Sequence, residues 1–141
     1  MRVGISSWTY TWDIGVPGHP PERPMDAMGL LARAAELGVR LVQFADNLPL
    51  DQLSSPELDA FERRASELDV RIEVGTRGIG HDNLRTYLQL AERLESSILR
   101  VVIDTADHQP DVDEVVDIIK AIAVPYAIHI FGSTQELHCL S

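Results

Sequence analysis

The sequence is poor in cysteine and in positive charge. The first shortage bears on the compartment we expect for the protein, and the second on the classes of partner it can bind. Among 141 residues Cys139 is the only cysteine, so no disulfide can form within the chain, and we expect an intracellular, cytoplasmic protein. Lysine and arginine number 12 against 22 acidic residues, a formal net charge of −10. Nucleic acids and anionic membranes are bound largely through basic side chains. We therefore expect no nucleic acid and no membrane as a partner.

Long hydrophobic runs are also missing from the sequence. No apolar stretch approaches the ~20 residues that a membrane-spanning helix needs, and the first residues turn polar too soon for a secretory signal. Hydrophobic residues make up 45% and charged residues 24%, which is ordinary for a globular protein. The length suits one domain better than two.

Short runs rich in β-branched residues alternate with amphipathic helical patterns. These runs predict strands at 2–7, 40–45, 70–75 and 98–103. Strands that alternate with helices favour an α/β fold with a parallel sheet. The near-continuous apolar strands predict burial on both faces of that sheet. No sequence repeat of 20–50 residues is visible, so any repetition is architectural.

Helix-capping residues mark the ends of the four predicted helices. Gly38 is placed to stop the first helix, and Ser55 followed by Pro56 is a strong start for the second. Asp82 is predicted to cap the third helix. Asp111, with Glu114 three residues later, resembles a capping box for the fourth.

Two α/β architectures fit this order, a doubly wound open sheet and part of a (β/α)8 barrel. A whole barrel needs ~250 residues, so this chain would hold about half of one. A dinucleotide-binding sheet should carry a glycine-rich turn after its first strand. Residues 6–12 have no such turn, and residues 75–80 lack the phosphate-loop spacing and its lysine. A nucleotide site is therefore not expected, while periodicity leaves the two architectures open.

The last nineteen residues differ in composition from the rest. Between residues 123 and 141 the only charged side chain is Glu136, whereas the first 122 residues hold the other 33. Residues 124–131 can form a fifth strand, in which Pro125 favours an edge or a strand start. The segment is predicted to be either an atypical tail foreign to the fold or a short strand with a loose terminus.

Four segments resemble the xylose isomerase-like TIM-barrel family of sugar phosphate isomerases and epimerases. They are GISSWTYTW at 4–12, GVPG at 15–18, VQFADNLPL at 42–50 and EVGTRG at 73–78. The resemblance covers residues 2 to about 122 and implies the barrel rather than the open sheet. It divides the chain into a partial (β/α) barrel at 1–122 and an atypical tail at 123–141.

The resemblance also implies a divalent metal in the full-length family, held by Glu, Asp and His residues on later strands. The first matching position here falls at 128–131, which contains no carboxylate. No metal ligand can be carried over, so we expect this chain alone to bind no metal tightly. His129, His138 and Cys139 do not have a usual zinc-ligand spacing.

Aromatic and polar residues follow the first two predicted strands, where a barrel places its functional face. Trp8 and Tyr10, with Trp12 nearby, could wall a sugar pocket or simply pack on the barrel mouth. Asp46 and Asn47 could bind substrate hydroxyls, or serve the turn before Pro49. Within the second strand, Gln43 could be structural or form the pocket floor.

Polar residues also follow the third and fourth predicted strands. Glu73, Thr76 and Arg77 surround the end of the third, and Arg77 could clamp a phosphate or carboxylate, or form a salt bridge to Glu73 or Asp46. Asp104, Asp107 and His108 follow the fourth strand. They could ligate a metal or do acid–base work, but a solvated acidic loop is the favoured interpretation. His81 is expected to belong to a helix cap.

The function implied by the resemblance is metal-assisted isomerisation or epimerisation of a sugar, sugar phosphate or polyol, through proton transfer at carbon. The catalytic residues are not identified, and the isolated chain is expected to be inactive. One alternative is a non-catalytic half-barrel whose open edges and uncovered apolar interior make it self-associate, as a homodimer for example. A second is an endonuclease of the same superfamily, which the acidic charge disfavours.

Overall fold

The computed structural model describes residues 3–122, 127–131 and 136–137. The chain forms two compact units, residues 1–73 and residues 74–141, and each is considered by itself. The predicted boundary between a partial barrel and a tail at residue 122 stays a prediction. No helix in the described ranges is both long and apolar enough to cross a membrane.

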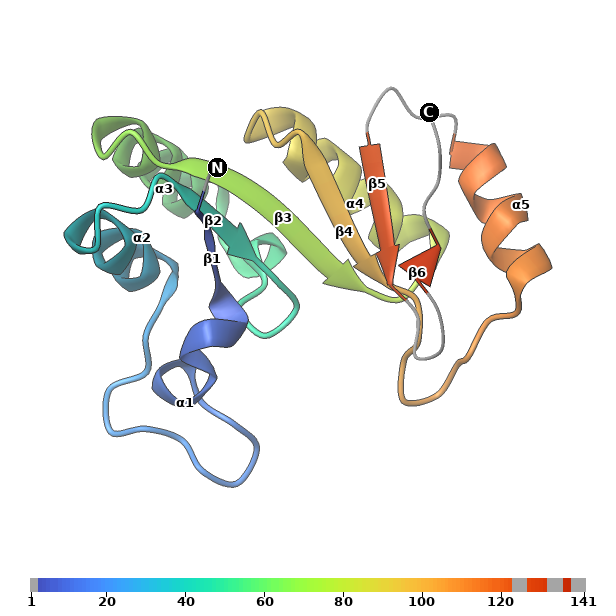
Figure 1. The fold of residues 1–141 in the computed structure, drawn as a ribbon, viewed down its shortest axis with the longest axis horizontal. Coiled ribbons are helices and arrows are strands. Elements are labelled where there is room, and N and C mark those ends of the chain that lie inside the picture. The colour runs from blue at the N-terminus through green and yellow to red at the C-terminus, as the bar shows by residue number, and fades with distance from the viewer. Residues whose placement is uncertain (1–2, 123–126, 132–135, 138–141) are drawn as a thin grey trace. The chain divides into compact units, whose positions relative to one another are not determined.

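The first unit contains two short parallel strands and the helices that follow them (Figure 1). Strand β1 pairs in parallel with β2, with Ile5 opposite Val42. The elements are β1 (Ile5–Ser6), η1 (Ser7–Tyr10), α1 (Thr11–Ile14), α2 (Ala27–Glu36), β2 (Leu41–Phe44), η2 (Leu50–Gln52) and α3 (Ser55–Glu67). The first residues of β3 complete the unit, where the Arg71 amide donates to the Arg40 carbonyl at 3.0 Å.

The second unit continues the same alternation. Strand β3 pairs in parallel with β4, β4 pairs in parallel with β5, and β5 pairs antiparallel with β6. The elements are β3 (Arg71–Arg77), α4 (His81–Arg93), β4 (Ile98–Val102), α5 (Val112–Ile122), β5 (Ala127–Phe131) and β6 (Glu136–Leu137). The predicted α/β class with parallel strands in chain order is confirmed, and the fifth strand exists from Ala127 onward. Residues 124–126 of that predicted strand lie outside the described residues.

One face of the strands is buried and the other is half-exposed, so the prediction of burial on both faces is wrong for β2 and β4. In β2, Val42 and Phe44 are fully buried while Leu41 and Gln43 are half-buried. Phe44 meets Phe61 of α3 edge to face, with ring centroids 5.1 Å apart. The same alternation holds in β4. The second face carries Gln43 in β2 and Arg100 in β4 beside apolar residues, and its residues are half-buried.

The three predicted helix starts agree with the structure to different degrees. Helix α3 begins at Ser55 as predicted, and Ser54 is its N-cap. Gly80 precedes α4, and Asp82 lies in its first turn without capping it. At α5 the Asp111 carboxylate accepts from the Glu114 amide at 2.9 Å, so only half of the predicted capping box forms.

The ends of α2, α3 and α4 share one connection to the next strand. In each, a leucine ends the helix and the next residue has a positive φ. The residue after that donates its N–H to the carbonyl of an alanine five positions back, which closes the last turn. The sets are Leu37-Gly38-Val39 with Ala34, Leu68-Asp69-Val70 with Ala65, and Leu94-Glu95-Ser96 with Ala91. The shared connection was not predicted from the sequence, whereas Gly38 stops α2 as expected.

Candidate functional site

A polar cluster lies where β1 and β2 end in the first unit. Ser7 follows β1 directly and is completely buried. Its hydroxyl donates to Asn47 Oδ1 at 2.6 Å and accepts from the Ala45 amide at 3.0 Å. The two loops after the strands are thereby tied together, at the strand ends where α/β folds place their ligands.

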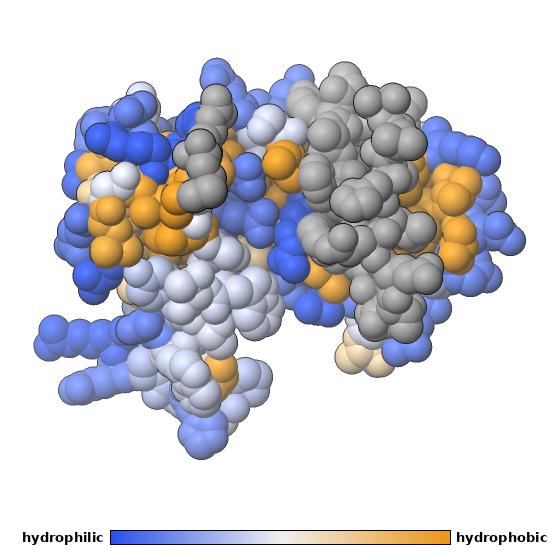
Figure 2. All heavy atoms as spheres, in the orientation of Figure 1, coloured by the Kyte–Doolittle hydropathy of each residue, from blue (hydrophilic) through white to orange (hydrophobic). Residues whose placement is uncertain are grey.

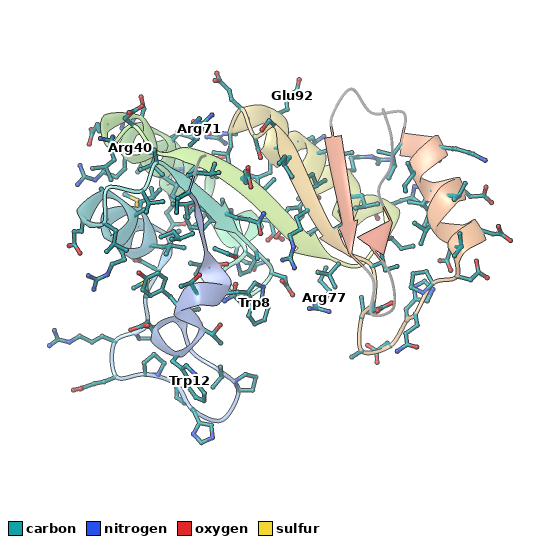
Figure 3. The ribbon with its side chains drawn as sticks, in the orientation of Figure 1. Trp8, Trp12, Arg40, Arg71, Arg77 and Glu92 are labelled. Atoms are coloured by element: carbon teal, nitrogen blue, oxygen red, sulfur yellow. The ribbon has the colours of Figure 1, made fainter. Side chains whose placement is uncertain are left out.

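A second bond runs beside the first between the neighbouring residues. The Trp8 indole donates from Nε1 to Asp46 Oδ1 at 3.2 Å, and Trp8 remains 44% exposed. Figure 3 shows Trp8 at this end of the unit and apart from Trp12. Trp8 and Asp46, each predicted as a site residue, are therefore brought together, and Trp8 stays partly exposed.

A third polar pair lies on the half-exposed face of the strands. Gln43 Nε2 donates to Glu73 Oε2 at 3.3 Å, and both side chains are half-buried. Gln43 is the partner of Glu73 in this unit, where the sequence suggested an arginine. An amide and a carboxylate held in this way can donate to and accept from the hydroxyls of a polyol.

Asn47 has one amide group that nothing satisfies among the described residues. Its Nδ2 atom is buried and has no hydrogen-bond partner there. A buried polar group without a partner costs about 1–3 kcal/mol. Such a cost at the carboxyl end of a parallel strand indicates a position kept for a ligand or a water molecule.

The remaining predicted aromatics do not join this cluster. Tyr10 is half-buried at the end of η1. Trp12 is 69% exposed and meets the His19 ring edge-on, with centroids 6.4 Å apart. The pocket wall of three aromatics is thus reduced to Trp8, with Trp12 on a separate surface.

In the second unit, Thr76 and Arg77 at the end of β3 take part in hydrogen bonds that fix the backbone of the following loops. Thr76 is buried and its hydroxyl donates to Asn83 Oδ1 at 3.2 Å. Asn83 Nδ2 in turn donates to the carbonyls of Arg77 and Gly78, at 3.2 and 2.9 Å. These bonds fix the connection between β3 and α4. The buried hydroxyl of Thr76 therefore has a hydrogen-bond partner within the protein and needs no ligand. Arg77 donates to the Asp104 carbonyl at 3.0 Å.

The loop after β4 is organised around His108. Its Nε2 atom lies 3.1 Å from Glu114 Oε2 in α5, and its amide donates to the Thr105 hydroxyl at 3.0 Å. Within the described residues, no group of three or more His, Cys, Asp or Glu side chains could hold a metal ion. No ligand set for the metal implied by the resemblance is thus found among these residues. Whether the chain binds metal tightly is not tested, and the expected lack of binding stays a prediction.

Ser7 is the site residue that sequence reasoning missed. The signal available was a second serine directly after a strand, at a position that must turn inward. Serine in loops is so common that this signal does not separate a buried hydroxyl from an exposed one. Its role depends on Asn47, 40 positions away along the chain.

Comparison with known proteins adds one relationship. The chain is 30% identical over 124 residues to 3-oxo-isoapionate decarboxylase of Pectobacterium atrosepticum, an alignment that takes in 86% of this chain and 43% of the relative. The chain thus spans less than half the length of that relative. No protein-family model matches the chain. The relative is named as a decarboxylase, so the predicted isomerase or epimerase reaction is not confirmed.

Proposed function

We propose that this chain supplies the substrate-binding part of an enzyme that acts on a polyhydroxylated oxo compound, such as a ketose or an oxo sugar acid. The observation that carries the proposal is the half-exposed indole of Trp8, bonded to Asp46 beside the buried Ser7–Asn47 pair. Aromatic faces pack on the C–H surfaces of such ligands, and carboxylates and amides bind their hydroxyls.

The decarboxylase relationship and the isomerase resemblance share one chemical requirement. Loss of carbon dioxide from a 3-oxo acid leaves an electron pair next to a carbonyl, delocalised as an enolate. Removal of a proton from a carbon next to a carbonyl leads to the same kind of species. Either reaction needs groups that stabilise the developing negative oxygen. We propose carbon chemistry beside a carbonyl, with decarboxylation and isomerisation or epimerisation as the two candidate outcomes.

Among the described residues, no group of three or more His, Cys, Asp or Glu side chains could hold the metal that the resemblance implies. The roles proposed here therefore concern binding alone. Trp8 offers its face, Asp46 fixes the indole and presents a carboxylate, and Gln43 with Glu73 forms a second polar pair. No bond-breaking step is assigned to any of them.

The two tryptophans allow a direct test of binding. In the Trp12→Phe variant, Trp8 is the sole tryptophan, and its fluorescence should change on titration with erythrulose or threonate. The Trp8→Phe variant retains only Trp12 and is the matched control, which should show no change. An unchanged Trp8 signal at tens of millimolar of both compounds, or an equal change in both variants, would contradict the proposal.

The reaction is tested separately with the same chain. Release of carbon dioxide from a polyhydroxylated 3-oxo acid would support decarboxylation, and deuterium uptake at carbon of a ketose from heavy water, without release of carbon dioxide, would support isomerisation or epimerisation. Neither assay affects the binding result, so binding without turnover would leave the binding role in place and would show that this chain alone does not complete the reaction.

A further inference from the structure

The bonds of Ser7 determine which way the Asn47 amide faces. A serine hydroxyl has one proton to donate and two lone pairs to accept with. The Ala45 amide, which can only donate, takes up a lone pair of the Ser7 hydroxyl at 3.0 Å. The hydroxyl proton is then free to be donated, and the Asn47 atom within reach, at 2.6 Å, is the carbonyl oxygen Oδ1.

This arrangement leaves the Asn47 amide no choice of orientation. If the amide were flipped, its NH2 group would face the serine hydroxyl, which would then have to accept from two donors and find a new acceptor for its own proton. Because Ser7 is completely buried, water cannot readily supply that acceptor. The NH2 group must therefore point away from Ser7, where it has no partner among the described residues.

We propose that Asn47 donates a hydrogen bond from Nδ2 to a carbonyl or carboxylate oxygen of the ligand. Ser7 is then the positioning residue that orients the Asn47 amide. The proposal rests on the proposed function, since it concerns the same site. It specifies the substrate class further: the ligand must present an acceptor oxygen at this point, beside the polar groups that bind its hydroxyls.

A carbonyl oxygen suits this position better than a hydroxyl. An amide NH2 group can only donate, and Asn47 Oδ1 already accepts from Ser7. A ligand hydroxyl facing Nδ2 would bring a proton of its own, which needs a further acceptor, such as the lone pair of Oδ1 that Ser7 does not use. A carbonyl or carboxylate oxygen brings none, so it satisfies the nitrogen without leaving a new group unpaired.

The amide lies near the surface, which makes access to it feasible. Asn47 as a residue is half-buried although its Nδ2 atom is covered. The neighbouring bond between Trp8 and Asp46 is exposed and, at 3.2 Å, at the long end of the usual range. Access of a ligand to the nitrogen would require neighbouring side chains to change rotamer, which exposed side chains do within nanoseconds.

The experiment compares erythrulose with erythritol, which differ only in having a carbonyl or a hydroxyl at one carbon. Binding to the full chain is followed by ¹⁵N NMR, and the Asn47 side-chain signals are assigned by their loss in Asn47→Asp. The wild-type chain should bind erythrulose more tightly and shift these signals. Asn47→Asp keeps an acceptor for Ser7 but replaces the donor, so erythrulose affinity should fall about tenfold while erythritol affinity changes less than about twofold.

Two further variants separate positioning from a merely structural role. Ser7→Ala should abolish the preference for erythrulose over erythritol, whereas a purely structural role would lower both affinities by the same factor. Gln89→Glu makes the same amide-to-acid change at an exposed residue of α4, and its preference should equal that of the wild type. Should Ser7→Ala fail to fold, Asn47→Asp alone decides.

The outcomes distinguish this inference from the function on which it rests. Binding of neither compound by the wild type would overturn both. Equal binding of the two compounds, or unchanged erythrulose affinity in Asn47→Asp, would overturn the role of Asn47 while leaving the polyol site in place. In that case a buried water molecule would be the partner of Nδ2.

Discussion

At the scale of single residues, two residues other than glycine have backbone conformations that suit glycine. Asp69 has φ 52° and Glu95 has φ 51°, at the positions where Gly38 follows α2 with φ 69°. A residue with a Cβ atom is strained in this left-handed region, whereas glycine is not. Asp69 also bonds Arg40 at 3.2 Å on the surface. Glu95 is exposed and is therefore the cleaner site for measuring this strain.

We predict that Glu95→Gly stabilises the protein by about 0.5–1 kcal/mol, because it removes that strain at the end of α4. Urea unfolding measures the change. Glu92→Gly is the matched control: Glu92 is helical in the last turn of α4, and there glycine should cost up to about 1 kcal/mol. A loss of stability in Glu95→Gly would show that the glutamate makes contacts worth more than the strain.

At the residue scale the sequence identifies some polar residues of the site and not others. It predicts Trp8, Asp46, Gln43 and Glu73 as site residues, and the structure pairs them. It does not single out the buried hydroxyl of Ser7, and its assignment of Thr76 to substrate binding stays a prediction. Both are polar residues at strand ends. Only their partners far along the chain distinguish a residue that orients the site from one that holds a loop.

At the scale of the elements, two hydrogen bonds at the start of α3 lower the pKa of Glu57. The Glu57 carboxylate accepts from the Ser54 hydroxyl at 2.6 Å and from the Ser54 amide at 2.8 Å. The hydroxyl bond, and then the amide bond, lower the pKa of Glu57 below its usual value of 4.5. Both bonds favour the ionised carboxylate, so protonation weakens the cap.

We predict that this cap makes α3 sensitive to acid. Because the pKa of Glu57 is lowered on folding, its stabilisation is present above the unfolded-state pKa and is lost as the pH falls through the folded-state value. The difference in unfolding free energy between wild type and Glu57→Gln should therefore shrink between about pH 5 and pH 3. Urea unfolding across that range measures it, with Glu92→Gln as the control. A difference that does not vary with pH would contradict the assignment.

The order of elements was predictable because it depends on local pattern. Strand and helix alternation follows from β-branched runs and amphipathic spacing, and all four predicted strands overlap observed ones. The cap of α4 was placed two residues away at Asp82, because neighbouring polar residues compete for the same role. The face on which Gln43 and Glu73 lie was not predictable from apolar content alone.

At the scale of the whole molecule, the reason to expect self-association changes. The expectation rested on an apolar inner face of the sheet, yet Ile72 is buried in the core and the other face carries Gln43 and Glu73. An apolar surface exists instead on α5, where Val112 is 61% and Val116 is 38% exposed. Figure 2 shows hydrophobic side chains at the surface over this helix. We expect association to involve this surface of α5.

The apolar area of this surface is compatible with a weak dimer. Covering about 300 Å² of apolar surface on each of two copies is worth roughly 15 kcal/mol at about 25 cal/mol per Å². Association costs roughly 4–15 kcal/mol in lost freedom, so about 0–11 kcal/mol remains, a range that includes a micromolar dimer at about 8 kcal/mol. The formal net charge of −10 makes two copies repel each other, and salt screens that repulsion.

We therefore predict concentration-dependent self-association at tens of micromolar that strengthens when sodium chloride is raised from about 0.05 to about 0.5 M, because screening removes the repulsion while the apolar contact persists. Sedimentation velocity measures it. The double variant Val112→Ser/Val116→Ser should remain monomeric under the same conditions, since it removes the apolar side chains that two copies would bury. Leu37→Ser, which removes a leucine 56% exposed at the end of α2, is the control and should associate like the wild type. A wild-type chain that stays monomeric at high salt, or a double variant that associates unchanged, would show that the α5 surface does not drive assembly.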